Sequence, residues 1–353
     1  MYRVYVGEKL IHDTNISTLR IHNAVAELEL GKTGRFEFLM YEDHPRYSDI
    51  VLMTAGIYVY RGEENIFSGR VLRIEYGMYN EKKVVCEGEL AFLNDTLIEP
   101  DAYYGNFYGY LERLVSVHNM QVDASKRFTV GRISFPDFEG YEYVYEEYAT
   151  ILAAINASII KHAEGYLQAR NENGVRYLDI LSYNDTAGTS NQPITLGKNL
   201  ISLQRTEDGE DLFSAILPLG GVVNNTRVTI GSVNGWNNFV VDEDAYNLCG
   251  YVAKVVILEG ITDPQKLKDA AIAYLRENYI AASNIEITMT DMSHIDDSYK
   301  SFTLGQNVTV SSPKHFTGTK TFKIMKMTIN VSDPTQTRIT VGKVNRGFVE
   351  SIA

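Results

Sequence analysis

The chain has 353 residues and a formal net charge of -12, from 33 Lys+Arg against 45 Asp+Glu. At about 150 residues per domain, this length predicts two or three domains rather than one small core. The acidic balance, with no basic run longer than Lys82-Lys83, argues against a general nucleic-acid binder, which needs clustered Lys and Arg.

Two cysteines, Cys86 and Cys249, are too few for a disulfide framework or a four-cysteine zinc module. We interpret them as buried or half-buried thiols of a chain folded in a reducing cytosol. Residues 1–6 lack the apolar core of a signal peptide, and no stretch reaches the roughly 18 apolar residues of a membrane span. The sequence therefore indicates a protein made soluble and inside the cell.

The first region, residues 1–97, has the pattern of short β-strands. Turn-forming segments such as residues 31–34 (GKTG) and 77–80 (GMYN) separate the apolar runs. Short strands at regular spacing predict a sandwich or barrel. The expected strands cover residues 4–6, 19–21, 26–30, 36–40, 57–60, 71–76 and 83–87.

Residues 100–196 are expected to form an α/β segment with two helices. Apolar residues recur at helical spacing over residues 107–120 and, more strongly, over residues 146–163, and Gly165 provides a stop. The Asn-Gly pair at residues 173–174 predicts a hairpin between strands at 166–170 and 175–181.

The remaining chain returns to β character. Strands are expected at residues 200–205, 211–219, 252–258 and 285–289, and a Gly/Asn-rich region at 222–250 carries the single tryptophan, Trp236. A helix is expected to begin at Thr262-Asp263-Pro264 and to end near Tyr279. Residues 303–342 are β again.

An internal repeat links the first and last β regions. A strand beginning at Gly56 is followed by Phe67-Ser68-Gly69, and one beginning at Gly305 is followed at the same offset by Phe316-Thr317-Gly318. In each case a second and a third strand follow. The pattern predicts two copies of one β module in which the glycine permits a bulge or bend and the phenylalanine closes the core.

Histidines and carboxylates offer no strong metal or acid–base pattern. No histidine pair has metal-ligand spacing, and His118 and His162 lie among apolar residues, which favours core or boundary positions. The segment 291–297 (DMSHIDD) could bind a divalent ion, but we favour a polar turn between two strands. The seven histidines are His12, His22, His44, His118, His162, His294 and His315.

The sequence contains no GxSxG nucleophile elbow. Its glycine-rich segments do not make a phosphate-binding loop, since Gly220-Gly221 is not followed by GK[ST] and Gly105 to Gly109 follows no clear strand. Glu142, Glu146 and Glu147 could be drawn as glycosidase carboxylates, but acids before a helix usually reflect its N-terminal charge preference. The tyrosines at 103, 104, 108, 110, 141, 143 and 145 fit either a protein or sugar contact surface or packing around the helices.

Two segments resemble a known family. Residues 285–293 (IEITMTDMS) and 302–310 (FTLGQNVTV) are similar to the "D-[LM]-S … LG-x-x-V-x-V" stretch of the tail-associated, or prophage endopeptidase tail, proteins of siphophages. The order of elements also fits this family over nearly the whole chain. The resemblance implies a baseplate hub in which three chains place six barrels in a ring between the six-fold tail tube and a three-fold tip.

The fold implied is α+β and β-rich, with two related antiparallel β-barrel domains and a discontinuous α/β domain. The first barrel would cover residues 1–97 and the second residues 198–225 with 301–348. The α/β domain would cover residues 98–197 and 226–300, and residues 349–353 would form a tail.

The preferred hypothesis is a non-enzymatic homotrimeric hub at the virion tail tip, made in the host cytoplasm. Its partners would be the tail tube or distal tail protein and the fibre, tape-measure or lytic tip components. Its acidic lumen would repel phosphates and let DNA pass without specific binding. No catalytic residue, cofactor or metal is assigned, because no segment matches a catalytic motif of the family. Longer members of the family continue after this region into fibre, peptidase or cell-wall-degrading domains, whereas this sequence stops at Ala353.

Two alternatives stay open. One is a cell-wall peptidase or muramidase, as the family name suggests. The other is a receptor-binding or saccharide-binding tail module that uses the tyrosine-rich segment and Trp236.

Overall fold

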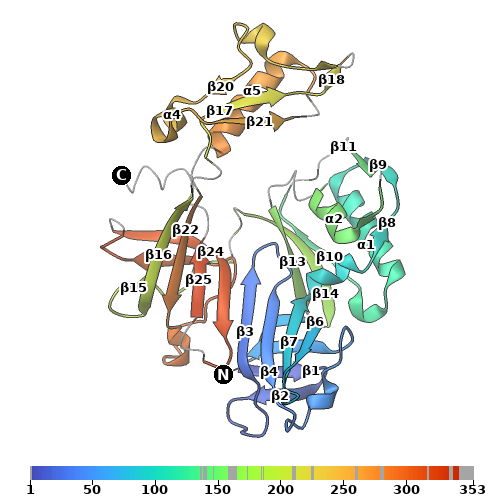
Figure 1. Cartoon of the computed structure of the whole chain (residues 1–353), viewed down its shortest axis with the longest axis vertical. Coiled ribbons are helices and arrows are strands. Elements are labelled where there is room, and N and C mark those ends of the chain that lie inside the picture. Colours follow the sequence, from blue (N-terminus) through green and yellow to red (C-terminus); the bar gives the residue numbers. More distant parts are fainter. Residues whose placement is uncertain are drawn as a thin grey trace. The chain divides into compact units, whose positions relative to one another are not determined.

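The computed structural model shows two compact units, which Figure 1 colours along the sequence. The larger unit contains residues 1–203 and 286–341, and the smaller unit is built on residues 204–285. The structure describes residues 2–135, 137, 141–145, 147–157, 165–172, 174–183, 185, 187–208, 212–223, 226–258, 261–278, 282–315, 318–333 and 337–341. The expected tail, residues 349–353, lies outside these ranges.

The first β module contains the strands expected over residues 1–97 with two differences, together with two 3-10 helices. Residues 19–21 form no strand, and β2 was not expected. One face of each strand is buried, as the alternation of Phe36, Phe38 and Met40 on one strand illustrates. The strands are β1 (Tyr2–Val6), β2 (Lys9–Asp13), β3 (His22–Glu29), β4 (Arg35–Met40), β5 (Gly56–Arg61), β6 (Glu64–Tyr76) and β7 (Lys82–Gly88), and the 3-10 helices are η1 (Tyr47–Asp49) and η2 (Glu89–Asn94).

The second β module is assembled from segments on both sides of the smaller unit. Its strands are β15 (Ile194–Thr195), β16 (Leu200–Asp208), β22 (Ala282–Met289), β23 (Asn307–Ser311), β24 (Thr319–Asn330) and β25 (Thr337–Val341), with the 3-10 helix η6 (Met292–His294). Its inward side chains are small or medium-sized apolar groups, such as Val308, Val310 and Ile339.

The two modules share one curled sheet. Its strand order is β16-β22-β25-β24-β3-β4-β7-β6-β5-β1-β2, with β23 beside β24 and β15 beside β23. The modules join where β24 pairs antiparallel with β3, in a register that places Met327 opposite Leu28. In the described residues the pairing runs from β16 to β2 without closing, so closure of each module into a barrel stays a prediction.

The internal repeat is confirmed by topology. The spatial order β3-β4-β7-β6-β5 in the first module equals the order β16-β22-β25-β24-β23 in the second, and the strands follow each other along the chain in the same sequence. Even a bulge recurs, since the register shifts between Val71 and Arg73 against β7 and between Ile324 and Lys326 against β25.

The predicted alignment of the repeat, which matched the two Phe-x-Gly segments, is wrong in its residue equivalences. The bulge makes Val71 equivalent to Ile324, so Gly69 corresponds to Phe322 and not to Gly318. Gly69 lies inside β6, where a Cβ would come within 2.0 Å of the Glu87 backbone oxygen, whereas Gly318 precedes β24 with φ of +75°. Phe316 and Thr317 lie outside the described residues.

A helical lobe packs beside the first module, within the larger unit. Its helix α1 (Phe107–Gln121) follows the expected residues 107–120, and α2 (Ile151–Ile155) begins after the Thr150 cap, because residues 149–150 form a strand. Residues 158–163 of the expected second helix lie outside the described residues. The lobe also contains β8 (Leu97–Ile98), β9 (Asp101–Gly105), η3 (Ala124–Lys126), β10 (Thr129–Ile133), β11 (Tyr141–Tyr145), β12 (Ala149–Thr150), β13 (Gly165–Glu172) and β14 (Val175–Ser182).

The smaller unit has its own core, in which α5 (Pro264–Asn278) packs on a three-stranded sheet of order β20-β17-β21. The expected cap is confirmed, since the Lys266 amide donates to the Asp263 carboxylate at 2.8 Å. Its other elements are β17 (Ala215–Leu219), β18 (Val222–Val223), β19 (Thr226–Arg227), η5 (Gly231–Val233), β20 (Val240–Val241), α4 (Glu243–Cys249) and β21 (Ala253–Ile257).

This smaller unit differs from the expected grouping of residues 198–225 with 301–348. The strand β17 pairs with β20 and with β21, in parallel with the latter, and not with any strand of the second module. The strands and the helix expected in this region are confirmed, but local sequence patterns do not indicate which sheet a strand joins. The compact units place residues 204–285 together, inserted between β16 and β22.

Candidate functional site

The distal half of β6 forms an exposed edge of the larger unit's sheet. On one side it pairs with β7 through Tyr76, but its pairing with β5 ends at Arg70. Val71 then exchanges backbone hydrogen bonds with the preceding loop, donating to Ala55 at 3.1 Å and accepting from Met53 at 2.7 Å. Beyond Val71, no described strand pairs with β6 on this side, so its backbone is available for another chain.

Large apolar side chains surround this edge. They come from β6, from the turn that follows it and from the loop that reaches Val71, and their exposed fractions run from 41% at Met53 to 88% at Met78. Exposed apolar groups gathered at one place typically mark an interaction surface. We call this set the edge patch: Val51, Leu52, Met53, Leu72, Tyr76, Met78 and Tyr79.

The two loops of the edge patch are held in place by polar contacts. The Tyr47 hydroxyl donates to the Asn80 carbonyl, and the Lys82 ammonium donates to the Tyr47 carbonyl at 2.7 Å. Lys82 also lies 4.0 Å from the centre of the Tyr47 ring, and its burial lowers its pKa. Met53 and Asn80 both adopt positive φ, of 62°. Such backbone values cost energy in residues other than glycine, so the loops keep a defined, strained shape.

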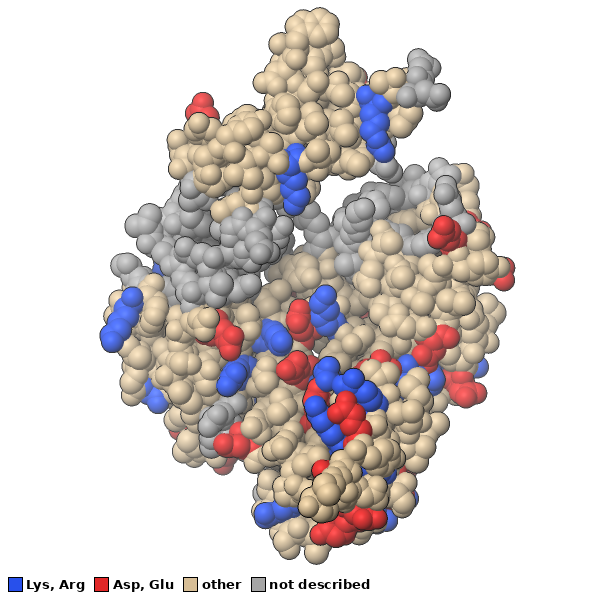
Figure 2. Space-filling view, in the orientation of Figure 1, with Lys and Arg blue, Asp and Glu red and all other residues tan. Residues whose placement is uncertain are grey.

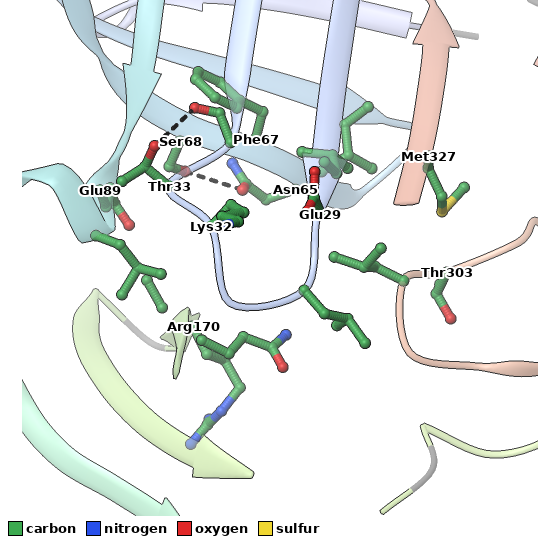
Figure 3. Close-up of a pocket in the computed structure, with 18 of the residues that line it drawn as sticks. Glu29, Lys32, Thr33, Asn65, Phe67, Ser68, Glu89, Arg170, Thr303 and Met327 are labelled. Carbon is green, nitrogen blue, oxygen red and sulfur yellow. Dashed lines mark hydrogen bonds between the residues drawn. The ribbon is translucent and has the colours of Figure 1, made fainter. Parts of the chain in front are cut away.

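A pocket of about 300 Å³ lies where the first module, β13 and the second module meet. Figure 3 shows Lys32 and Thr33 on the β3–β4 loop at its rim, with Phe67 of β6 and Met327 of β24 on its walls. Neither a histidine nor a cysteine lines it. Two of its acids are paired, because Glu64 accepts from Arg61 at 2.7 Å and Glu89 accepts from Arg176 at 2.6 Å. These two carboxylates are therefore engaged in ion pairs, and the remaining acid of the lining is Glu29.

Buried charges tie the first module to the helical lobe. Arg70 on β6 donates to Glu87 on β7 at 2.8 Å and to Asp95 after η2 at 2.8 Å. Burial alone raises the pKa of Asp95, but hydrogen bonds from Arg70 and Lys126 outweigh it and hold that pKa below its usual value. Because Arg70 lies on the same strand as Leu72 and Tyr76 of the edge patch, this network holds the exposed edge in place.

Several of the described histidines are buried in the fold. His118 is fully buried and bonds Thr96 at 2.8 Å and the Lys126 carbonyl at 3.0 Å, which confirms its core position. His12 accepts from the Ile21 amide at 3.3 Å, and burial lowers its pKa to about 4. Burial likewise lowers the pKa of His44, His118 and His294. His162 lies outside the described residues.

The acidic segment 291–297 forms the polar turn that we favoured. Asp291 is buried, and its carboxylate accepts from the Gln192 amide and from the Ser293 backbone, both at 3.0 Å. Asp296 accepts from the Ser298 backbone at 2.9 Å. These carboxylates are used to cap backbone groups, and the described residues contain no group of three or more His, Cys, Asp or Glu side chains placed to hold a metal.

The tyrosine-rich segment is divided between the two interpretations. Tyr110 and Tyr143 are buried in the helical lobe with their rings stacked 4.2 Å apart, which supports packing around the helices. Tyr104 is mostly exposed, at 71%, which suits a contact surface. The side chain of Glu142 and all of Glu146, which belong to the drawn glycosidase set, lie outside the described residues, and Glu147 is exposed.

The smaller unit exposes large apolar side chains at two places. Trp236 is 89% exposed on a turn with φ of 67°, and Val255 and Ile257 of β21 are each about half exposed. The helix α5 packs against the opposite side of this sheet, through Ala271 and Leu275. An exposed tryptophan ring can pack against the apolar C–H face of a sugar.

Charge is mixed over the visible face of the larger unit. Figure 2 shows Lys and Arg side chains interspersed with Asp and Glu, so this face carries no single-sign patch that would favour nucleic acid. Within the described part of the chain, no helix is long and apolar enough to cross a membrane.

Sequence reasoning missed the edge patch, although its signal was present. The segment 77–80 (GMYN) was interpreted as a simple turn, but Met78 and Tyr79 are unusual residues at a solvent-exposed turn. Only the pairing of β6 shows that Leu72 and Tyr76 belong to the same surface.

Known proteins share this architecture. Residues 188–352 match the family described as prophage endopeptidase tail, which confirms the resemblance seen in the sequence. The whole fold is similar to the 43 kDa tail protein of prophage MuSo2 from Shewanella oneidensis, with a TM-score of 0.69, 14% identity and coverage of 100% of this chain and 99% of that one. No curated protein matches the sequence.

Two further solved structures agree. A tail protein from Neisseria meningitidis MC58 gives a TM-score of 0.67 at 14% identity, over 97% of this chain and 96% of that one. Prophage tail protein gp18 from Listeria monocytogenes EGD-e gives 0.59 at 12% identity, over 99% and 96%. At such identities the likeness establishes the fold, and the function needs its own argument.

Proposed function

We propose that this chain, which carries the prophage endopeptidase tail region and the fold of prophage tail proteins, is a non-enzymatic structural protein of a phage tail. In this proposal it forms a homotrimeric hub at the tail tip, between the tail tube or distal tail protein and the fibre, tape-measure or lytic components. The observation that carries the proposal is the duplicated five-strand module within one continuous sheet.

Duplication supplies a physical reason for a trimer. A chain with two equivalent modules presents two equivalent sets of contacts, so three chains can present six quasi-equivalent units to a six-fold tube. The exposed edge of β6 supports the same proposal, because edge strands are normally covered by another strand, helix or chain. The net charge of -12 suits a ring through which DNA passes without being bound.

The mass of the protein in solution tests this proposal. Light scattering or native mass spectrometry should show three chains of 39.8 kDa, and electron microscopy should show a ring with a central opening. A protein that stays monomeric at all accessible concentrations, or that forms only two-fold dimers, would contradict the hub.

Cell-wall hydrolysis is the alternative that the family description favours, since it names an endopeptidase. The described residues around the pocket, with Glu64 and Glu89 both paired to arginines, argue for a non-enzymatic chain. Zymography on purified peptidoglycan decides between them, and cleared zones produced by the purified chain would establish the enzyme.

Saccharide binding is a second alternative, supported by the exposed Trp236. Binding of host wall polysaccharide that is lost in Trp236→Ala, but not in Tyr246→Ala, would assign this activity to the smaller unit. Tyr246 is a suitable control because it is also exposed, at 50%.

A further inference from the structure

The equivalence of the two modules allows their outer contacts to be compared residue by residue. Val71 lies opposite Cys86, and Ile324 lies opposite Val341, each immediately before the shared bulge. The backbone amides of both residues also donate to equivalent carbonyls. Val71 donates to Ala55, just before β5, at 3.1 Å, and Ile324 donates to Gln306, just before β23, at 2.9 Å. The distal halves of β6 and β24 are therefore equivalent strands in equivalent surroundings.

Their partners differ. In the second module, the Met325 carbonyl accepts from the Leu30 amide at 3.0 Å, and residues 326–330 then pair antiparallel with β3. In the first module, the equivalent residues begin at Leu72 and continue through Tyr76, and no described strand pairs with them on the side away from β7. Each chain thus contains one completed pairing between modules, β24 with β3, which we call a seam. It also contains one equivalent strand half, the distal half of β6, that has no such partner among the described strands.

Burial of the equivalent side chains follows the same difference. Met327 and Ile329, on the completed seam, are each 1% exposed. Their equivalents by the bulge are Ile74 and Tyr76, and Tyr76 is 61% exposed. A strand placed along β6 would cover these side chains and the adjoining edge patch.

The strand that fits this position is identified by the repeat. The partner of β24 is β3, the first strand of the five-strand repeat in the first module, and its equivalent in the second module is β16. That strand ends the sheet, pairing with β22 on one side, and its Ile201 is 58% exposed. Each chain therefore contains both strands that a second seam needs, the distal half of β6 in the first module and β16 in the second.

We propose that the distal half of β6 in one chain pairs antiparallel with β16 of a neighbouring copy, repeating between chains the β24–β3 seam within each chain. The contact is heterologous, with different surfaces on the two copies, so it propagates in one direction, and in the proposed trimeric hub it closes as a ring. Backbone hydrogen bonds supply its register, and the edge patch supplies apolar burial. This inference rests on the proposed hub function and names the residues of its interface.

Cross-linking tests the pairing directly. Glu75→Cys and Ile201→Cys are placed in separate chains, each in a Cys249→Ser background, and Cys86 is buried enough to stay unreactive. The two proteins are mixed, allowed to exchange, and treated with a short bismaleimide. We expect a linked pair containing one chain of each kind, and little linkage in either protein alone. Linkage of Glu75→Cys chains to each other would overturn the inference in favour of a two-fold contact.

A charge insertion provides an independent test. Leu72→Lys with Tyr76→Lys places two ammonium groups at the proposed seam and should weaken association at least tenfold, as measured by light scattering over a dilution series. The matched control is Met120→Lys with Tyr148→Lys, because these side chains are similarly exposed, at 76% and 66%, and lie in the helical lobe. Equal association of both variants would overturn the inference.

The outcomes separate the inference from the proposed function. A trimer that shows no linkage between Glu75→Cys and Ile201→Cys chains would refute the seam and leave the hub intact. An open-ended oligomer that shows this linkage would support the seam and refute the trimeric hub. A monomer without linkage would refute both.

Discussion

Single buried side chains connect the parts of the larger unit, and Arg70 is the clearest case. Its guanidinium lies 5.1 Å from the centre of the Phe92 ring and bonds carboxylates from two different elements. Losing it would leave Glu87 and Asp95, whose side chains are 19% and 22% exposed, with less compensation for burial.

We expect Arg70→Met to lower the free energy of unfolding by about 3 kcal/mol, because breaking a buried ion pair leaves charge unpaired. The control is Lys9→Met, since the Lys9 side chain is 52% exposed and its contact with Asp49 is screened by solvent. Urea unfolding measures both variants. Equal losses would show that the Arg70 network carries no special weight.

Histidine burial gives the fold a pH dependence whose sign can be derived. His12 has a folded pKa of about 4, against 6.5 in the unfolded chain. Between these values the unfolded chain binds more protons, so stability falls as pH drops from 6.5 toward 4, by about 3 kcal/mol for this residue. His44, His118 and His294 shift in the same direction.

We expect His12→Asn to flatten the rise of stability between pH 4.5 and 6.5, because an amide oxygen can still accept from the Ile21 amide but does not titrate. Urea unfolding at several pH values checks this. His22→Asn is the control, since His22 is exposed, and it should keep the wild-type slope. The same slope in both variants would contradict the assignment.

At the scale of strands, equivalent positions in the two modules perform different tasks. Met327 is buried at the seam between β24 and β3, whereas its equivalent Ile74 lies on the exposed half of β6. The same substitution should therefore damage folding in one module and assembly in the other.

We expect Met327→Lys to cost 3 kcal/mol or more, since it buries an unpaired charge, whereas Ile74→Lys should change monomer stability by less than about 1 kcal/mol. Unfolding at low protein concentration measures the stability, and light scattering measures the loss of association that we expect only of Ile74→Lys. Similar unfolding costs at both positions would show that the two strands are not in different environments.

At the scale of the whole chain, the smaller unit is an insertion between two strands that a short turn can join. The equivalent strands of the first module, β3 and β4, are connected by residues 30–34 alone. The smaller unit also has its own core, formed by Phe213, Ile216, Val256, Ala271 and Leu275. Its removal should thus leave the larger unit folded.

Replacing residues 209–281 with the turn sequence GKTG tests this prediction. We expect the shortened chain to unfold cooperatively and to keep the same oligomeric state, because both halves of the proposed seam remain. Circular dichroism and light scattering are the measurements. An unfolded product would show that the larger unit depends on the inserted residues.

The sequence alone determined the local elements and the existence of a repeat. Apolar periodicity placed α1 and α5, the Asn-Gly pair placed the β13–β14 hairpin, and strand spacing indicated two copies of a β module. These features depend on neighbours within a few residues, which a single sequence records directly. The resemblance to prophage tail proteins rested on similarly local stretches and is confirmed.

Only the tertiary structure shows how the strands pair, and this pairing decides the alignment of the two modules and the sheet that each strand joins. The bulge, and not the Phe-x-Gly spacing, aligns the two modules, because equal spacing between two residue pairs does not specify which residues lie opposite each other in the sheet. The place of β17 in the smaller unit and the free edge of β6 depend on which strands lie side by side. Those partners are more than a hundred residues apart where β3 meets β24, and local residue patterns carry no information about contacts at that range.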